Sequence, residues 1–490
     1  MNISLKMENI KILFHTGPFD GTGKEGAHLT KKMRDKLQEY NYDPTFFTDN
    51  KECALELKRL NIEIIYIPDE MKKIKVKNVF LELSQLEQKY QFNAQKILFG
   101  DTDYSSIDYK KSMEDMVKYF YVLDTIISKD NFDFVYSCGN KMMGLVSEVI
   151  VKGKDKPIYV GITAAIFSNC FTLSNDNYGR FNLMDYYFNQ EKIELNDKEE
   201  KDVKKVIANF KSEAITSTLS LEELYKPTLS INKVKYFFDR LKISFIEKDT
   251  PYLNVSRGLK KYLLRLIRTN LLRFGFYEKC KNKHFFYFPL QTFDDTTGRV
   301  WCNHIESRLS MIKLVARALP ANCLLYTKEH PAEIGSTSLK ILREIKKIPN
   351  VRLLHYAESN KKLILKSKGV ITLAGTTGME SIFLGKPVIL FGRSYYDFPS
   401  LVTKVNDYEK LDETLREIYN YPKKTNEKKA IHLLRALRKS SHECLFAMKQ
   451  YFYSNEIDNS KVLSDENMSE YAKGIVKLSK LMKTVKSEKT

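Results

Sequence analysis

Residues 369–399, GVITLAGTTGMESIFLGKPVILFGRSYYDFP, contain the pattern that decides the fold. An apolar run of strand length ends at Ala374, a turn and a short helical segment follow, and a second apolar run starts after Gly385. Two buried strands joined through a helix form the βαβ unit of a parallel sheet. The segment therefore predicts an α/β fold, with a turn at the carboxyl end of a strand, where ligands of such sheets bind.

The turn itself has the composition of a phosphate site. Gly375 permits a tight bend, and Thr376 and Thr377 stand where the helix begins. The first turn of a helix has unpaired N–H groups and the positive end of the helix dipole, and two hydroxyls add further donors. Glu380, one turn later, is expected to reach a ribose hydroxyl. The alternative is that Thr377 only caps the helix.

A second strand end precedes this turn in the sequence, in LLYTKEHPAEIG (residues 324–335). The apolar strand ends in Lys328, Glu329 and His330, and Pro331 stops the strand. A histidine at such an end can donate a hydrogen bond to a phosphate or a base carbonyl. We therefore expect the segment to contact a nucleotide, with an ordinary surface histidine as the alternative.

A third strand end lies in YFPLQTFDDTTGRVW (residues 287–301). It contains Gln291 and the carboxylate pair Asp294 and Asp295. Beside a nucleotide, such a pair could orient a sugar or act as acid or base. The two aspartates could equally cap a turn or a helix.

The alternation of strands and helices extends well beyond these segments. Strands are expected near residues 9–15, 61–68, 132–140, 157–163, 284–291, 322–331, 350–356, 369–375 and 386–392. A chain of 490 residues exceeds one ordinary core. The pattern predicts two facing doubly wound α/β domains. The expected division is an N-terminal domain at 1–195, a basic helical connector at 196–283, a C-terminal domain at 284–410, and helices at 411–490 that pack back on the domains.

Composition limits the cellular context and the partners. The seven cysteines are scattered, and no two form a CxxC pair, so neither a disulfide framework nor a zinc site is expected. A reducing cytoplasm suits this usage best. Neither a secretory leader nor an apolar run of spanning length is visible. The net charge of +19 indicates an anionic partner: nucleic acid, a membrane surface or a phosphorylated substrate.

Much of the positive charge gathers in residues 256–283, SRGLKKYLLRLIRTNLLRFGFYEKCKNK. Leucine and isoleucine recur there at helical spacing between lysines and arginines, and Glu278 is the single acid of the segment. A basic amphipathic helix of this kind can lie on an anionic bilayer. The alternative is a connector helix that packs on its own domains. Nucleic acid is not expected, because no recognised binding module accompanies the charge.

Two turns in the N-terminal half are candidate acceptor contacts. HTGPFDGTGKEGAHLT (residues 15–30) contains a GxGxxG string, but its spacing excludes a P-loop, and a lone GxGxxG is weak evidence for a dinucleotide site. We expect Lys24 and His28 to face the acceptor, with a plain surface turn as the alternative. Asn140 and Lys141, at the end of another strand, are expected to line the cleft between the two predicted domains.

Taken together, the three C-terminal segments resemble the capsule polysaccharide biosynthesis glycosyltransferases, the family that includes the β-Kdo transferases of capsule export systems. The resemblance rests on an ordered set of motifs. They are Pro289-Leu290-Gln291, Lys328-Glu329-His330-Pro331, Gly375-Thr376-Thr377-Gly378-Met379-Glu380, Gly385-Lys386-Pro387-Val388, and Phe391-Gly392 with Tyr395 and Tyr396.

The resemblance implies a GT-B-like pair of Rossmann-like domains, a CMP-activated sugar held mainly by the C-terminal domain, and no obligatory metal. The His-Pro pair would contact the nucleotide. The sequence also departs from the family pattern. Asp294 and Asp295 replace a Pro-Glu pair, the Glu-x-Gly stretch is not visible near residues 163–167, and a carboxylate of the N-terminal half falls at Asp176.

From these residues we expect a glycosyltransferase of bacterial surface polysaccharide synthesis that transfers a sugar, first of all Kdo, to a lipid-linked or glycan acceptor. Asp176 or Asp295 would be the catalytic base or nucleophile. Two alternatives stay open: a CDP-alditol phosphotransferase of the teichoic-acid type, and a degenerate member that binds glycan or acts as a scaffold. The expected location is the cytoplasm, with peripheral contact to the inner face of the cytoplasmic membrane.

Overall fold

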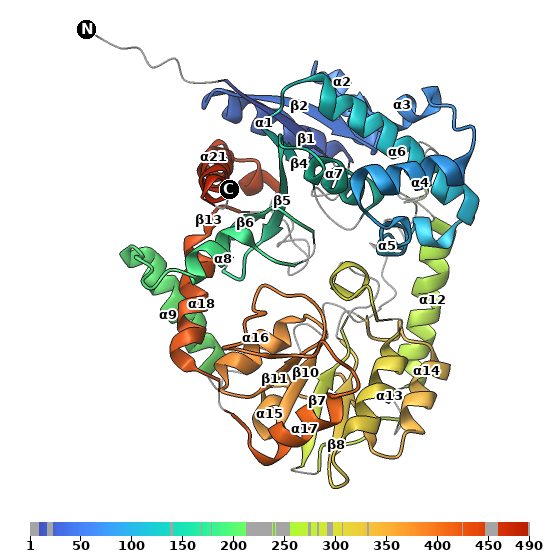
Figure 1. The fold of residues 1–490 in the computed structure, drawn as a ribbon, viewed down its shortest axis with the longest axis vertical. Coiled ribbons are helices and arrows are strands. Elements are labelled where there is room, and N and C mark those ends of the chain that lie inside the picture. The colour runs from blue at the N-terminus through green and yellow to red at the C-terminus, as the bar shows by residue number, and fades with distance from the viewer. Residues whose placement is uncertain are drawn as a thin grey trace. The chain divides into compact units, whose positions relative to one another are not determined.

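The computed structural model describes most of the chain and divides it into two compact units (Figure 1). Unit 1 comprises Met1–Glu191, Arg240–Leu253 and Ala436–Thr490, and unit 2 comprises Lys192–Asp239 and Asn254–Arg435. The described residues are 9–16, 23–137, 141–167, 169–177, 179–211, 238, 241, 255–272, 276–281, 284–291, 297–305, 307–330, 333–423, 425–445 and 459–488.

Unit 1 is built on a seven-stranded sheet with the order β13-β6-β5-β4-β1-β2-β3. From β5 to β3 the strands are parallel, whereas β6 and β13 are antiparallel to their neighbours. The strands are β1 (Ile10–His15), β2 (Tyr42–Thr48), β3 (Ile65–Tyr66), β4 (Phe134–Tyr136), β5 (Ile158–Ala164), β6 (Cys170–Ser174) and β13 (Ser441–Glu443).

Helices pack on this sheet through apolar faces, and one of them comes from the far end of the chain. The last helix, α21, contacts α1, and its Ile475 and Met482 lie in the same core as Phe14 of β1. The helices are α1 (Gly23–Gln38), α2 (Lys51–Arg59), α3 (Ile67–Lys73), α4 (Val79–Tyr90), α5 (Ala94–Gly100), η1 (Tyr104–Ser106), α6 (Tyr109–Lys129), α7 (Met142–Lys152), α8 (Asn182–Phe188), α20 (Asn459–Val462) and α21 (Asp465–Ser487).

Unit 2 has a six-stranded parallel sheet with the order β12-β11-β10-β7-β8-β9. In chain order this is the 3-2-1-4-5-6 arrangement of the Rossmann fold. The strands are β7 (Phe285–Pro289), β8 (Leu324–Lys328), β9 (Val351–Leu354), β10 (Gly369–Thr372), β11 (Val388–Leu390) and β12 (Thr403–Lys404). Their central residues are almost all fully buried, as the continuous apolar runs predict.

The helices of unit 2 include the basic segment, which forms α12. They are α9 (Asp197–Lys211), α12 (Val255–Leu271), η2 (Thr297–Trp301), α13 (Arg308–Ala318), α14 (Leu339–Lys346), α15 (Asn360–Lys366), α16 (Thr376–Phe383), α17 (Leu411–Asn420) and α18 (Glu427–Lys439), which ends in unit 1. Within the described ranges, no helix combines the length and apolar character needed to cross a bilayer.

The prediction of two Rossmann-like α/β domains is confirmed by these two sheets, and all five strands predicted at 284–392 are present. The strand predicted at 61–68 is wrong in extent. It shrinks to β3, because Pro68 lies in the first turn of α3, where its missing N–H costs nothing. The two units do not follow the predicted division into four consecutive segments, because contacts place α12 in unit 2 and α21 in unit 1.

Candidate functional site

The site begins at the point where the strand order of unit 2 changes direction. β7 and β10 are neighbours in the sheet, with Gly369 opposite Phe286 and Val370 opposite Tyr287. After β7 the chain continues to β8 on one side, and after β10 it continues to β11 on the other. The crevice that this reversal opens at the carboxyl ends is where ligands of open α/β sheets bind.

Gln291, just after β7, ties the two strand ends together. Its Nε2 donates to Thr372 Oγ1 at 3.1 Å, and its Oε1 accepts from the Ala374 N–H at 3.2 Å. The Gly375 N–H also donates to Thr372 Oγ1, at 3.1 Å. A Cβ at Gly375 would overlap the Gln291 amide nitrogen, so any larger residue there would displace the Gln291 amide. The predicted binding residues Gln291 and Gly375 are therefore in direct contact.

The helix that follows, α16, opens directly from this turn. Its N-cap is Gly375, which has no side chain to cap the first N–H groups, and the Gly378 N–H donates to the Gly375 carbonyl at 3.0 Å. The alternative in which Thr377 caps the helix is therefore wrong: Thr376 and Thr377 are the first two helical residues, one exposed and one buried. Tyr396 OH donates to the Gly375 carbonyl at 2.5 Å and fixes the turn from behind. An uncapped helix N-terminus of this kind suits an anion.

Two charged groups beside the turn have strongly shifted pKa values. Burial raises the pKa of Glu380 to about 7, although the charge of Lys328 opposes the shift. Burial lowers the pKa of Lys328 to about 8, against the attraction of Glu380 and Glu358. The Lys328 ammonium donates to the carbonyls of Tyr356, at 3.1 Å, and Glu358, at 2.5 Å. Lys328 thus holds the loop after β9, while Glu380 remains a titratable group near neutral pH.

The next two residues of the Lys-Glu-His-Pro motif, Glu329 and His330, differ in their exposure to solvent. Glu329 is buried, and one of its oxygens accepts from Tyr277 OH at 2.9 Å. His330 is exposed, yet desolvation by the surrounding chain, followed by the charges of Lys328 and Arg308, lowers the pKa of its imidazole. His330 is therefore a neutral donor or acceptor at pH 7. Pro331 lies outside the described residues.

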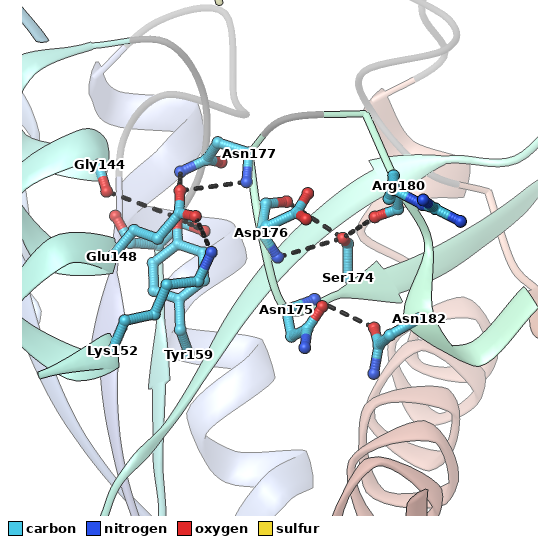
Figure 2. A network of polar contacts seen from close by, with 11 residues as sticks. Gly144, Glu148, Lys152, Tyr159, Ser174, Asn175, Asp176, Asn177, Arg180 and Asn182 are labelled. Carbon is cyan, nitrogen blue, oxygen red and sulfur yellow. Dashed lines mark hydrogen bonds and ion pairs between the residues drawn. The ribbon is translucent and has the colours of Figure 1, made fainter. Parts of the chain in front are cut away.

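In unit 1, a buried polar network holds the loop that contains Asp176 (Figure 2). Glu148 of α7 is 2% exposed, and its Oε2 accepts from the Asn177 backbone N–H at 3.1 Å and from Asn177 Nδ2 at 2.7 Å. Asn177 Nδ2 also donates to Tyr159 OH at 2.7 Å. Burial raises the pKa of Glu148, and the nearby carboxylate of Asp176 adds to that shift.

The direction of β6 decides where Asp176 lies. β6 is antiparallel to β5, and Ser174 pairs with Gly161 rather than with the last residue of β5, Ala164. Ala164 lies three positions beyond Gly161, a rise of about 10 Å along the strand. The loop therefore leaves the sheet well back from the carboxyl edge, and a catalytic role for Asp176 stays a prediction. Asp295 lies outside the described residues.

The predicted acceptor contacts are spread over unit 1. Lys24 and His28 lie on the exposed face of α1, and His28 Nε2 is 3.8 Å from a carboxylate oxygen of Glu56. Lys141 contacts Asp103, as well as a buried aspartate that accepts from the first N–H of α7. The described contacts do not join these residues into one site, and Asn140 is outside the described residues.

Sequence reasoning missed Glu148, although the sequence contained a clue. It is the single acidic residue of the largely apolar helix MMGLVSEVIVK, where a buried charge needs polar partners. Among the described residues, no group of three or more His, Cys, Asp or Glu side chains is arranged to hold a metal ion.

Comparison with known proteins finds similarity in the part of the chain that contains the unit 2 site. The family described as "Capsule polysaccharide biosynthesis protein" matches residues 262–423. The capsule polysaccharide modification protein LipB of Neisseria meningitidis serogroup A is 26% identical over 214 residues, which are 39% of this chain and 48% of LipB. LipB of serogroup B is 27% identical over the same shares. The chain thus spans about half the length of the curated relatives it matches.

Solved structures give a more distant likeness. The β-Kdo 2,7 transferase of Thermosulfurimonas dismutans KpsC is 14% identical with a TM-score of 0.33, over 76% of this chain and 97% of that one. The UDP-GlcNAc 2-epimerase of Methanocaldococcus jannaschii is 11% identical with a TM-score of 0.24, over 87% and 98%. The resemblance inferred from the motifs is confirmed by sequence: residues 262–423, with the strand-end turn of β10 among them, are similar to the capsule polysaccharide biosynthesis proteins.

Proposed function

We propose that the protein is a glycosyltransferase of bacterial surface polysaccharide synthesis and that unit 2 binds a CMP-activated sugar. The observation that carries the proposal is the Gln291–Thr372–Gly375 turn. It joins the two strand ends at the point where the strand order reverses and leaves the first N–H groups of α16 without a side-chain cap. A phosphate is the ligand class that such a turn suits best.

In this proposal the nucleotide contacts come from two strand ends, those of β8 and β10. The N–H groups and hydroxyls of Thr376 and Thr377 hold the phosphate, Glu380 accepts from a ribose hydroxyl, and neutral His330 contacts the phosphate or the base. Fixed donors at the phosphate stabilise the charge that develops on the leaving nucleotide. Because the α16 N-terminus supplies this positive field, no metal ion is part of the proposal.

Sequence similarity supports the same assignment. The matched residues, 262–423, include every residue proposed here for nucleotide binding, and the matched relatives are named for capsule polysaccharide biosynthesis and modification. Kdo is the first choice of sugar because the ordered motifs resemble those of the β-Kdo transferases. The acceptor would be a glycan or a lipid-linked glycan, with Asp176 or Asp295 as the candidate catalytic carboxylate.

Helix α12 supports a location at a membrane surface. One stripe of its side chains is apolar and exposed, and α12 has no acidic residue. The opposite face is anchored, since Arg265 donates to the Ile334 carbonyl at 2.6 Å and Arg268 to the Ser336 carbonyl at 2.9 Å. We infer that the stripe rests on an anionic bilayer on the cytoplasmic side. The stripe consists of Leu259, Leu263, Ile267 and Leu271, which are 42%, 46%, 53% and 60% exposed.

The experiment that tests nucleotide binding is a thermal-shift titration of the full chain with CMP, CDP, UDP, GDP and ADP. A ligand that binds only the folded protein raises its stability as ln(1 + [L]/Kd), or about 2.7 kcal/mol at 100 Kd. We expect CMP to give the largest shift and His330→Ala to reduce it. His355→Ala, which changes a histidine outside the proposed contacts, is the matched control and should keep the full CMP response.

Each other outcome changes the proposal in a defined way. Preference for CDP would favour transfer of an alditol phosphate, and the phosphate would then appear in the product. Preference for UDP or GDP would discard the CMP-sugar. No response to any of the five nucleotides would contradict the proposed transferase and leave a glycan-binding or scaffold role.

A further inference from the structure

Unit 1 has its own reversal of strand order, between β1 and β4, and a histidine lies there. β1 pairs with β4 on one side and with β2 on the other, and Phe14 lies opposite Tyr136. The next residue of β1 is His15, and the residue after β4 is Ser137. Ligands bind at such reversals in open α/β sheets, so unit 1 offers a second position of the kind seen in unit 2.

His15 is buried and held in one orientation. It is 2% exposed, and its ring stacks on Phe47 of β2 with 5.1 Å between ring centroids. Its Nδ1 lies 3.2 Å from Ser137 Oγ. Ser137 is fixed in turn, because its N–H donates to the Val160 carbonyl at 3.0 Å and its carbonyl accepts from Tyr159 OH at 3.3 Å. The imidazole is therefore preorganised on two sides.

The other ring nitrogen of His15 has no such partner. Nε2 is buried and makes no hydrogen bond among the described residues. The nearest acid contact is Asp49, just after β2, whose carboxylate oxygen is 4.0 Å away, beyond hydrogen-bonding distance. Buried polar atoms are nearly always paired, so an unpaired one needs an explanation. A ligand hydroxyl within reach of both Nε2 and the carboxylate would supply one.

Asp49 is placed as firmly as His15. The strand ends of β1 and β2 are joined, because the Thr16 N–H donates to the Phe47 carbonyl at 2.9 Å and Thr48 Oγ1 donates to the Thr16 carbonyl at 2.8 Å. The Asn50 N–H donates to Thr48 Oγ1 at 3.1 Å. The separation of Nε2 and the carboxylate is thus set by paired backbone rather than by a free loop.

We propose that His15 and Asp49 form the hydroxyl-binding site for the acceptor, and that Nε2 of His15 takes the proton of that hydroxyl. This inference rests on the proposed glycosyl transfer and adds the acceptor side to it. With the Nδ1 hydrogen donated to Ser137 Oγ, Nε2 has the lone pair that a proton acceptor needs. The Asp49 carboxylate then faces the imidazolium that forms and stabilises its charge.

The bonds balance as follows. The acceptor oxygen forms the new bond to the anomeric carbon of the sugar, and its proton moves to Nε2. The nucleotide leaves with the electron pair of its bond to that carbon, and His15 later returns the proton to water. The candidate carboxylates Asp176 and Asp295 are then not needed to deprotonate the acceptor.

The test uses the full chain with CMP-Kdo as donor and the methyl glycoside of Kdo as acceptor, and measures CMP release and product together. We expect His15→Ala to lower turnover by 100-fold or more, the size of a lost general base, and added imidazole to restore part of it. Asp49→Asn should lower turnover at least tenfold. In both variants CMP should still raise the melting temperature as it does in the wild type.

His284→Ala is the matched control, because His284 is an exposed histidine just before β7, at the opposite end of that strand from the proposed nucleotide contacts, and it should keep wild-type turnover. If His15→Ala does not fold, His15→Asn and Asp49→Asn decide the question. Turnover within twofold of wild type in these folded variants would overturn the His15 site and leave the transferase intact. A wild-type protein that binds none of the nucleotides and transfers no sugar would contradict the proposed function itself.

Discussion

At the scale of single residues, the unit 2 site contains two groups whose protonation state changes near neutral pH. Glu380 has a pKa raised to about 7 and Lys328 a pKa lowered to about 8, both through burial. Perturbed pKa values of this kind gather at functional sites. In the proposed complex, a ribose hydroxyl that donates to Glu380 would favour the ionised carboxylate and offset the free-energy cost of its burial.

The first prediction concerns Glu380→Gln in the free protein. The folded-state pKa lies above the ordinary value of 4.5, so the unfolded chain ionises first and stability is lost as pH rises through about 7. Relative to wild type, we expect Glu380→Gln to gain melting temperature between pH 4 and pH 8. The gain should be at least roughly 2–4 °C, the effect of about 1 kcal/mol in a domain of this size.

Glu344→Gln is the control for this measurement, because Glu344 is a glutamate of α14 whose pKa is lowered through its hydrogen bond to Lys347. It should show no gain at pH 8. Parallel curves for Glu380→Gln and wild type across the whole pH range would mean that Glu380 ionises as an exposed glutamate does.

At the scale of elements, α12 has an exposed apolar face and an opposite face that is anchored to unit 2. Arg265 and Arg268 hold it to the loop before α14, where a Cβ at Gly335 would overlap Thr269 Oγ1. The close approach explains why the loop needs glycine there, with φ at +72°. Anchoring one face leaves the leucine and isoleucine stripe exposed, so the proposed membrane contact and the attachment to unit 2 use different faces of the helix.

The second prediction concerns this stripe. Leu263→Glu and Ile267→Glu each replace apolar area that would enter the bilayer with a charge that an anionic surface repels. We expect each to lower cosedimentation with vesicles of one part phosphatidylglycerol to one part phosphatidylcholine at least tenfold, or about 1.4 kcal/mol. Leu365→Glu, an exposed leucine of α15, should bind as wild type does. Equal binding by all four proteins would remove α12 from the membrane contact.

At the scale of the whole molecule, the chain builds two units, and unit 1 is completed by a helix from the far end of the chain. α21 supplies part of the unit 1 core, and Ser479 of α21 hydrogen-bonds Tyr136 of β4 deep in that core. Unit 2 keeps its own core, which includes Leu415 of α17. Each unit therefore has the buried apolar cluster that a cooperative unfolding transition requires.

The third prediction uses one buried residue from each core. Ile475→Ala in unit 1 and Leu415→Ala in unit 2 remove side chains that are 0% exposed, at a cost of about 2–5 kcal/mol each. In differential scanning calorimetry we expect each variant to lower a different transition, and CMP to raise the one that Leu415→Ala lowers. A single transition that both variants lower equally would show that the units unfold together.

Much of unit 2 could be predicted from sequence because its strands are buried on both faces. Such strands read as apolar runs bounded by glycine and proline, and β7, β10 and β11 follow this pattern most closely, whereas Arg352 interrupts β9. β2 was harder, since Asp43 and Pro44 interrupt it. β13 is only three residues long and depends on pairing with β6, which no local pattern reveals.

The sequence by itself determined the α/β class, the parallel sheet of unit 2 and the turn at Gly375, because periodicity and turn chemistry are local properties. The tertiary structure alone decided which strand ends meet. Gln291 contacts Thr372 across 81 positions, and His15 meets Ser137 across 122, through sheet neighbours that are distant in the chain. It also showed that antiparallel β6 carries Asp176 back from the carboxyl edge. Strand order and direction are set by packing of the whole core, and no single segment contains that information.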